Sequence, residues 1–205
     1  MSETLPPVKN IYGNFWYRLV ALIIDAIVLG LMSSVVMVPL IMYFFKDGFD
    51  MDAEKMVENQ LLSGAIGYIL YIIYGTFMES SKWQGGIGKK VLNLKVTNLE
   101  GEALSFSEAL QRNLFKYWAT LITVIFPFVS DIKPFVAEPG MEPTEMLNLM
   151  FGSGYMLISL SLGILSFIGY IIAAFTERRQ SIHDMLAKTV VLNTKTKSAS
   201  TDDEW

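Results

Sequence analysis

The chain alternates between long apolar runs and short charged segments, and this pattern predicts a protein that crosses a membrane several times. The run 19–45 has 27 residues and a single charged side chain, Asp25, and the run 147–175 has 29 residues with no charge. The run 61–78 is close to the minimum length for a crossing. About 20 apolar residues cross a hydrocarbon layer roughly 30 Å thick. We therefore place three membrane-spanning helices at about 17–45, 61–78 and 147–175.

A fourth apolar run, 117–129, has only 13 uncharged residues, which leaves two alternatives. It is either a short or kinked span over about 113–129 or a re-entrant or surface helix. Basic residues in short loops collect on the cytoplasmic side of a membrane. Segment 46–60 holds two basic and five acidic residues, and segment 130–146 holds one basic and four acidic residues. Both loops are therefore expected outside, which requires four crossings and puts both termini in the cytoplasm.

The segments between the spans predict small elements on the cytoplasmic side. The stretch before residue 117 has the spacing of an amphipathic helix, with Ser105 or Ser107 as its N-cap. Residues 91–97 and 188–193 alternate loosely between apolar and polar side chains, which predicts a small β hairpin or sheet.

The predicted fold class is thus an all-α membrane protein with four transmembrane helices, an amphipathic inner-face helix and a small cytoplasmic β element. Residues 1–193 form a single membrane domain in this interpretation. Residues 194–205 are polar and are expected to form a disordered cytoplasmic tail.

Composition narrows the range of functions that the chain can have. Hydrophobic residues make up 52% of the chain and charged residues 18%, against about 25% charge in an average soluble domain. The net charge of −4 argues against a nucleic-acid partner. The chain has no cysteine and one histidine, so we expect neither a metal site nor a cofactor, and no enzymatic activity. The expected surroundings are the plasma (inner) membrane and its anionic lipid head groups.

Asp25 is the residue with the clearest chemical meaning. Counting about 1.5 Å per residue from Trp16 and Tyr17, it lies roughly 12 Å into the hydrocarbon layer, where an unpaired carboxylate costs at least a few kcal/mol. It is therefore protonated, paired, hydrated or bound to a cation. Three roles stay open: a lock between helices, a proton or cation site, and a docking point for a partner. Arg18 lies roughly 10 Å away along the helix, so we expect a hydroxyl or a cation from another helix to contact Asp25.

Arg18 itself is expected at the inner membrane surface, where Asp184 lies at the same level. A carboxylate such as Asp184 accepts two hydrogen bonds from one guanidinium, and Arg18 is the natural donor. Arg178, Arg179 and His183 stand close to Asp184 in the sequence. We expect His183 at the surface, with a proton relay or pH sensor as the alternative.

Lys89 and Lys90 close the sequence Gly-Gly-Ile-Gly-Lys-Lys, which resembles a phosphate-binding loop. The Ser or Thr after the lysine and the spacing between the glycines are both missing, so we reject nucleotide binding. A tight turn with Lys89 and Lys90 against anionic lipid is the simpler interpretation.

Three blocks of the sequence together resemble the RDD family of small membrane proteins, which takes its name from one arginine and two aspartates. The blocks are FWYRLVALIIDAIVL (15–29), GGIGKKVLNLKVTNLEGEALSFSEALQRNLFK (85–116) and ERRQSIHDMLAKTVVL (177–192). The resemblance implies that Arg18, Asp25 and Asp184 are the residues of the name. It also implies either cation–proton exchange or a role as a cofactor of a membrane complex. The segment 130–146 is longer than the usual connection in the family.

Two functions follow as hypotheses. The first is a proton-linked transporter or exchanger of small cations, in which Asp25 alternates between proton and cation and Arg18 and Asp184 form an inner gate. Such a small bundle would need a homo-oligomer to enclose a path. The second is a non-transporting scaffold or assembly factor, in which the same three residues clamp the helices and the segment 79–116 docks a membrane-protein partner.

Overall fold

The fold was analysed in a computed structural model of the chain. The structure describes residues 11–44, 53–132, 134 and 140–195. Most of the predicted tail, from residue 196 onward, lies outside the described residues.

Helices dominate the described part of the chain. In chain order they are α1 (Phe15–Phe44), α2 (Ala53–Ser80), α3 (Ile87–Val91), α4 (Phe106–Lys116), α5 (Trp118–Val129), α6 (Pro143–Gly152), α7 (Gly154–Ile171), the 3-10 turn η1 (Ile172–Ala174) and α8 (Ile182–Leu186). The two strands are β1 (Leu94–Asn98) and β2 (Thr189–Asn193).

Among the described residues, three helical segments are long and apolar enough to cross a membrane: Phe15–Tyr43, Lys55–Ser80 and Gly154–Ala174. They correspond to the three long runs of the sequence. Within the predicted short or kinked span 113–129 the helix is interrupted at Tyr117: amphipathic α4 ends at Lys116, and the apolar α5 that follows has 12 residues. The predicted span 147–175 is also divided, since Ser153 has extended backbone between α6 and α7.

The chain forms two compact units, which are described separately. The sheet unit comprises Met1–Leu31, Tyr71–Lys116 and Phe167–Trp205. The helical unit comprises Met32–Leu70 and Tyr117–Ser166. In the helical unit the Tyr155 hydroxyl donates to the Thr123 carbonyl oxygen, 3.3 Å away.

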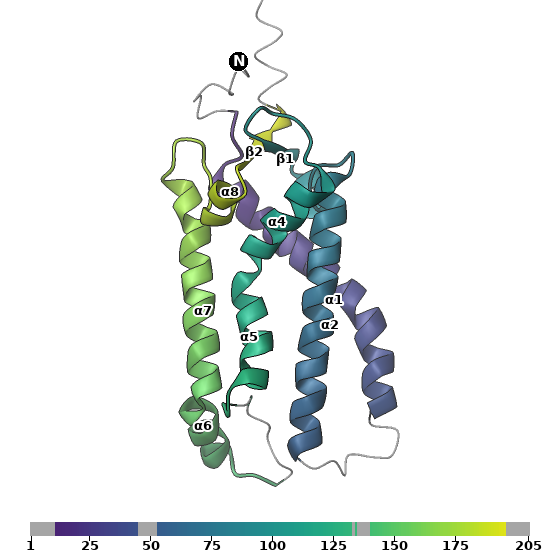
Figure 1. The fold of residues 1–205 in the computed structure, drawn as a ribbon, viewed down its shortest axis with the longest axis vertical. Helices are drawn as coiled ribbons and strands as arrows, with labels where there is room; N and C mark the ends of the chain where they lie inside the picture. The colour runs from purple at the N-terminus through teal and green to yellow at the C-terminus, as the bar shows by residue number, and fades with distance from the viewer. Residues whose placement is uncertain (1–10, 45–52, 133, 135–139, 196–205) are drawn as a thin grey trace, which may run out of the picture. The chain divides into compact units, whose positions relative to one another are not determined.

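The sheet unit contains the small β-sheet that the sequence predicts. The strands β1 and β2 pair antiparallel, with Leu94 opposite Asn193 and Asn98 opposite Thr189 (Figure 1). They come from distant parts of the chain, so the structure is a long-range sheet and not a hairpin. The segment before α1 extends it, because Tyr12 forms an antiparallel bridge with Leu192.

The apolar face of this sheet fixes the beginning of α1 and of α4. The core cluster consists of Ala21, Leu94, Val96, Leu104, Ala109 and Val191. Ser105 caps α4 in a capping box, since its backbone N–H donates to the Glu108 carboxylate at 2.7 Å and its Oγ accepts from the Glu108 N–H at 3.3 Å. The prediction of Ser105 as a cap is confirmed. The sheet thus packs against the beginnings of both α1 and α4.

Gly88 of α3 provides a test of how closely α3 approaches α1. A Cβ atom at Gly88 would overlap the carbonyl oxygen of Ala21, which is backbone and has no rotamer to change. We expect Gly88→Ala to lower the free energy of unfolding in detergent by about 1–3 kcal/mol, as overpacking does. The matched control is Gly163→Ala in α7, where a Cβ atom would lie within 4 Å of no described atom beyond its chain neighbours and the backbone of its own helix; its effect should stay below about 1 kcal/mol. Equal effects of the two variants would contradict the close approach.

A candidate site of buried charges

Asp184 is held in place by the beginning of α8. Ser181 precedes this short helix, and its backbone N–H and hydroxyl donate to Oδ2 of Asp184 at 3.0 and 2.7 Å. This capping box fixes the rotamer of Asp184 and gives the backbone N–H of Ser181, the N-cap residue of α8, an acceptor. The side chain of Asp184 is fully buried.

Two arginines bind the carboxylate of Asp184. The Arg18 guanidinium donates to Oδ2, and Arg112 of α4 donates to Oδ1 at 2.6 Å. Arg18 also donates to the backbone carbonyl of Arg179, a residue with left-handed backbone (φ 50°). The ion pair between Arg18 and Asp184 that the sequence analysis expects is therefore present.

A second buried carboxylate, Glu79, stands at the end of α2. Its Oε1 accepts from Arg112 Nη1 at 2.5 Å and from Lys89 Nζ at 2.7 Å, and its Oε2 accepts from Asn113 Nδ2 at 3.0 Å. Glu79 is 1% exposed. Arg112 also donates from Nε to Thr189 Oγ1 in β2 at 3.1 Å, so every edge of its guanidinium has an acceptor.

These ion pairs form one continuous sequence of alternating sign, which we call the charge chain. Its members are Lys89, Glu79, Arg112, Asp184 and Arg18. Burial alone would raise the pKa of Asp184, but Arg18 and Arg112 hold that pKa well below its usual range. Burial would lower the pKa of Arg112, and Glu79 and Asp184 raise it above its usual value instead. Asp184 and Arg112 therefore both stay ionised at neutral pH.

Asp25 lies beside the charge chain and is bound differently. Its Oδ1 accepts from the Tyr74 hydroxyl at 2.9 Å and from the backbone N–H of Gly88 at 2.8 Å. Tyr74 belongs to α2, so the expected hydroxyl from another helix is found. Gly86 comes so close that a Cβ there would lie 2.5 Å from both carboxylate oxygens. Among the ion pairs that the structure describes, none involves Asp25.

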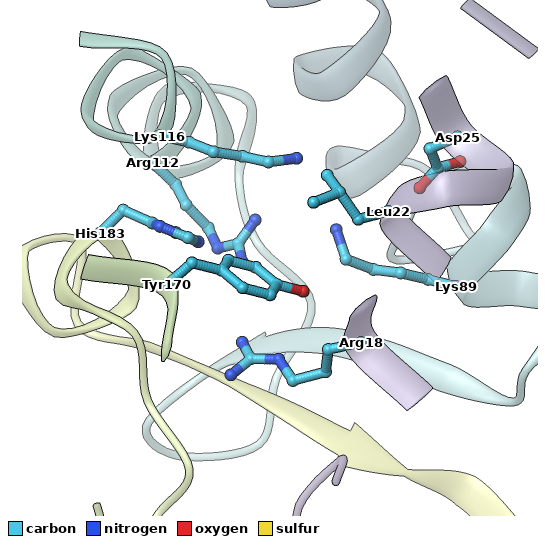
Figure 2. Close-up of a pocket in the computed structure, with 8 residues that line it drawn as sticks. All are labelled: Arg18, Leu22, Asp25, Lys89, Arg112, Lys116, Tyr170 and His183. Carbon is cyan, nitrogen blue, oxygen red and sulfur yellow. The ribbon is translucent and has the colours of Figure 1, made fainter. Parts of the chain in front are cut away.

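Asp25 and three members of the charge chain line the same cavity, whose volume of about 10 Å³ is room for about one water molecule. Figure 2 shows the side chains that surround it. They are Arg18, Leu22, Asp25, Lys89, Arg112, Lys116, Tyr170 and His183. Among the described residues, no group of three His, Asp or Glu side chains is arranged to hold a metal ion.

His183 corrects one expectation, because it is buried and not at the surface. It is 9% exposed, one ring nitrogen lies 3.0 Å from Ser181 Oγ, and the ring stacks on Tyr170 with centroids 6.2 Å apart. Burial, helped by the charge of Arg112 and opposed by Asp184, lowers the pKa of His183 to about 3. The imidazole is therefore neutral near pH 7.

The structure also places the four remaining residues that the sequence analysis singled out. Lys89 is buried on Glu79, so the expectation that it contacts lipid is wrong. Lys90 is exposed and lies 5.9 Å from the Trp83 ring centroid. Arg179 contributes its backbone to Arg18 and donates from its side chain to the Tyr12 carbonyl at 3.4 Å. Arg178 is half-buried and forms no part of the charge chain.

Sequence reasoning missed the central members of the site. In the sequence, Arg112 was visible only as a basic residue in an amphipathic helix. Glu79 was visible only as the charge that ends the second apolar run. Lys116, which was not among the predicted site residues, also lines the cavity. One signal was available: Arg112 and Asn113 lie on the buried side of α4, where an amphipathic helix normally carries apolar residues.

The fold and the site together define an integral membrane protein with a buried cluster of charges beside an acidic residue in its first span. The chain belongs to the RDD family, whose family model matches residues 12–188. The resemblance seen in the sequence is thereby confirmed.

The chain is also similar to several bacterial proteins. It is 25% identical over 190 residues to YxaI of Bacillus subtilis (strain 168), covering 88% of this chain and 96% of YxaI. It is 33% identical over 92 residues to proteins named thiol-disulfide oxidoreductase ResA from Bacillus thuringiensis (strain Al Hakam) and Bacillus anthracis. That match covers 43% of this chain and 51% of each ResA chain. This chain has no cysteine, so its own side chains supply no thiol. No solved structure matches the chain.

His183 makes the stability of the protein depend on pH in a defined direction. An unfolded histidine has a pKa of about 6.5, and the folded value is about 3. Between these values the unfolded chain binds a proton that the folded chain does not, so stability falls as pH decreases from about 6.5. Asp184 adds a further loss of stability as the pH falls below about 4. We expect the thermal midpoint in detergent to drop between pH 7 and pH 5, and His183→Gln to reduce this drop.

Because the chain has one histidine, NMR of its ring offers an unambiguous control. The folded protein should show no protonation of the ring between pH 7 and pH 5. A ring that titrates near pH 6.5 in the folded protein would show that His183 is solvated.

Proposed function

We propose that the chain is a proton-linked membrane transporter in which Asp25 is the proton-accepting group. One observation carries this proposal. Asp25 lies within a candidate membrane span, is 7% exposed, lines a cavity that has room for water, and accepts hydrogen bonds from the neutral Tyr74 hydroxyl and Gly88 amide. Ionisable residues inside membrane segments are usually functional, because retaining them is expensive.

The contrast with the other two buried carboxylates supports this assignment. Glu79 and Asp184 are each bound by two cationic side chains, so protonating either one would leave buried positive charges without a partner, at a cost of several kcal/mol. Asp25 has two neutral donors, and a proton on its carboxylate breaks no ion pair. Of the three, Asp25 is the carboxylate whose charge changes at the lowest cost.

The same surroundings bear on which positive ion Asp25 receives. The sequence suggests a small cation, but four basic side chains line the cavity: Arg18, Lys89, Arg112 and Lys116. Two like charges 4 Å apart repel each other by about 4 kcal/mol at an effective dielectric constant of about 20. We therefore propose the proton, and not a metal cation, as the positive ion that Asp25 receives.

The proposed membrane arrangement follows from the charge of the loops. We propose that α5 makes the fourth crossing in a plasma membrane and that both termini are cytoplasmic. At about 1.5 Å per residue, 12 residues give about 18 Å, which is short of a roughly 30 Å core. Local thinning of the bilayer or a second copy of the chain would shield this segment. We also propose that exposed Lys90 contacts anionic lipid head groups.

A second function, a scaffold or assembly factor without transport, is favoured by the charge chain itself. Its ion pairs fasten α1, α2, α3, α4 and α8 to one another, as a rigid docking platform requires. In that case Asp25 is one more fastening point, and a membrane-protein partner binds to the cytoplasmic side.

Proton flux in sealed liposomes separates the two functions. The full chain would be reconstituted with a pH-sensitive dye inside, and a potassium gradient with valinomycin would supply the driving voltage. We expect acidification that depends on the protein and that Asp25→Asn reduces at least tenfold. The matched control is Asp131→Asn, because Asp131 is exposed and lies in the helical unit; its flux should equal that of the parent.

Two results would decide against transport through Asp25. Asp25→Asn liposomes that acidify as fast as the parent would exclude Asp25 as the proton acceptor. Liposomes with the parent protein that acidify no faster than empty ones would favour the scaffold, provided that Asp25→Asn lowers the thermal midpoint.

A further inference from the structure

A groove lies between the beginning of α1 and the end of α7, within the sheet unit. Its volume is about 530 Å³, which falls within the range of about 300–1,000 Å³ for sites that hold small molecules. Phe15, which lines the groove, packs on Tyr170 of α7 with ring centroids 5.9 Å apart. The lining comes from 14–19 and 167–179, and both segments belong to the same compact unit. The groove is therefore a feature of one packed unit.

The groove is apolar where its walls belong to the candidate spans and polar just beyond them. Trp16, Leu19 and Phe167 lie within the first and the last candidate span, and Trp16 and Phe167 are 67% and 53% exposed. Asn14 immediately precedes the first span, and Arg179 follows the last one. A molecule that matches this surface has an apolar tail and a polar head, as a phospholipid does.

Arg179 gives the polar end of the groove a positive charge. Its backbone is fixed, because its carbonyl oxygen accepts from Arg18. Among the described residues, its side chain donates one hydrogen bond, to the Tyr12 carbonyl at 3.4 Å, and forms no ion pair. A guanidinium has five N–H donors and binds phosphate oxygens two at a time. No carboxylate is among the described residues that line the groove, so the head group that it favours is anionic.

We propose that this groove is a binding site for one anionic glycerophospholipid, such as phosphatidylglycerol. Arg179 holds the phosphate, and one acyl chain lies against Trp16 and Phe167. This site differs from the general attraction of exposed Lys90 to the membrane surface, because it needs both the apolar groove and the guanidinium. The inference does not rest on the proposed function, since a transporter and a scaffold would hold the lipid in the same way.

Trp16 is a reporter inside the groove, because bromine atoms on an acyl chain quench the fluorescence of an indole that they contact. The full chain would be placed in phosphatidylcholine nanodiscs that contain a small fraction of brominated phosphatidylglycerol or, in parallel, of brominated phosphatidylcholine. The quenching of Trp16 is the difference between the parent and Trp16→Phe. We expect brominated phosphatidylglycerol to quench Trp16 about fivefold more strongly at low fractions, the factor that one basic side chain contributes near a membrane surface.

Two variants test the two parts of the site separately. Arg179→Gln keeps an elongated polar side chain and removes the charge, so it should reduce quenching by phosphatidylglycerol to the level of phosphatidylcholine. Ala174→Phe fills the groove and should reduce quenching by both lipids. The matched control is Lys188→Gln, which removes an exposed cation with the same left-handed backbone (φ 52°) outside the groove lining. It should keep the full preference for phosphatidylglycerol.

Three results would overturn the proposal. The first is equal quenching of the parent by the two lipids, and the second is a preference for phosphatidylglycerol that Arg179→Gln retains. The third is an absence of quenching by either lipid, as expected if a second copy of the chain covers the groove. None of these readings depends on proton flux, so a failure here leaves the proposed function in place, and an absence of flux in liposomes leaves the lipid site in place.

Discussion

The charge chain is the interaction on which the rest of the sheet unit depends. Taking an ion out of water costs several kcal/mol even after the protein relaxes, and Lys89, Glu79, Arg112, Asp184 and Arg18 are all nearly or fully buried. Each cost is offset because the signs alternate and each carboxylate serves two cations. Removing one member leaves its neighbours buried and unpaired, which costs about 3–5 kcal/mol. The ion pairs therefore specify which ends of α1, α2, α3, α4 and α8 meet.

The position of Asp25 follows from this arrangement. Because Glu79 and Asp184 neutralise most of the nearby cationic charge, Asp25 takes its hydrogen bonds from Tyr74 and the Gly88 amide. The approach of Gly86 and Gly88 to α1 is possible only without side chains. The glycine-rich turn, which superficially resembles a phosphate loop, thus serves a carboxylate and not a phosphate. The fold thus separates a set of paired ions from one carboxylate that is bound by neutral donors.

The length and polarity of the apolar runs were enough to predict the three long spans, because a hydrocarbon layer imposes a length that can be counted. The pairing of Arg18 with Asp184 was predictable because both lie at the same predicted membrane depth and an arginine matches a carboxylate in shape. The roles of Arg112 and Glu79 were not, since Arg112 lies 33 positions from Glu79, 72 from Asp184 and 77 from Thr189 in the sequence, and packing selects these partners. The burial of His183 and Lys89 was missed for the same reason, because only the tertiary fold encloses them.

A double-mutant cycle between Arg18 and Asp184 tests the central claim most directly. The free energies of unfolding in detergent would be measured for the parent, Arg18→Met, Asp184→Asn and the double variant. If the charge chain holds the sheet unit together, the two substitutions are strongly coupled, with an interaction energy of at least about 1.5 kcal/mol. Additive effects, with a coupling below about 0.5 kcal/mol, would show that the pair does not organise the fold and would contradict the account.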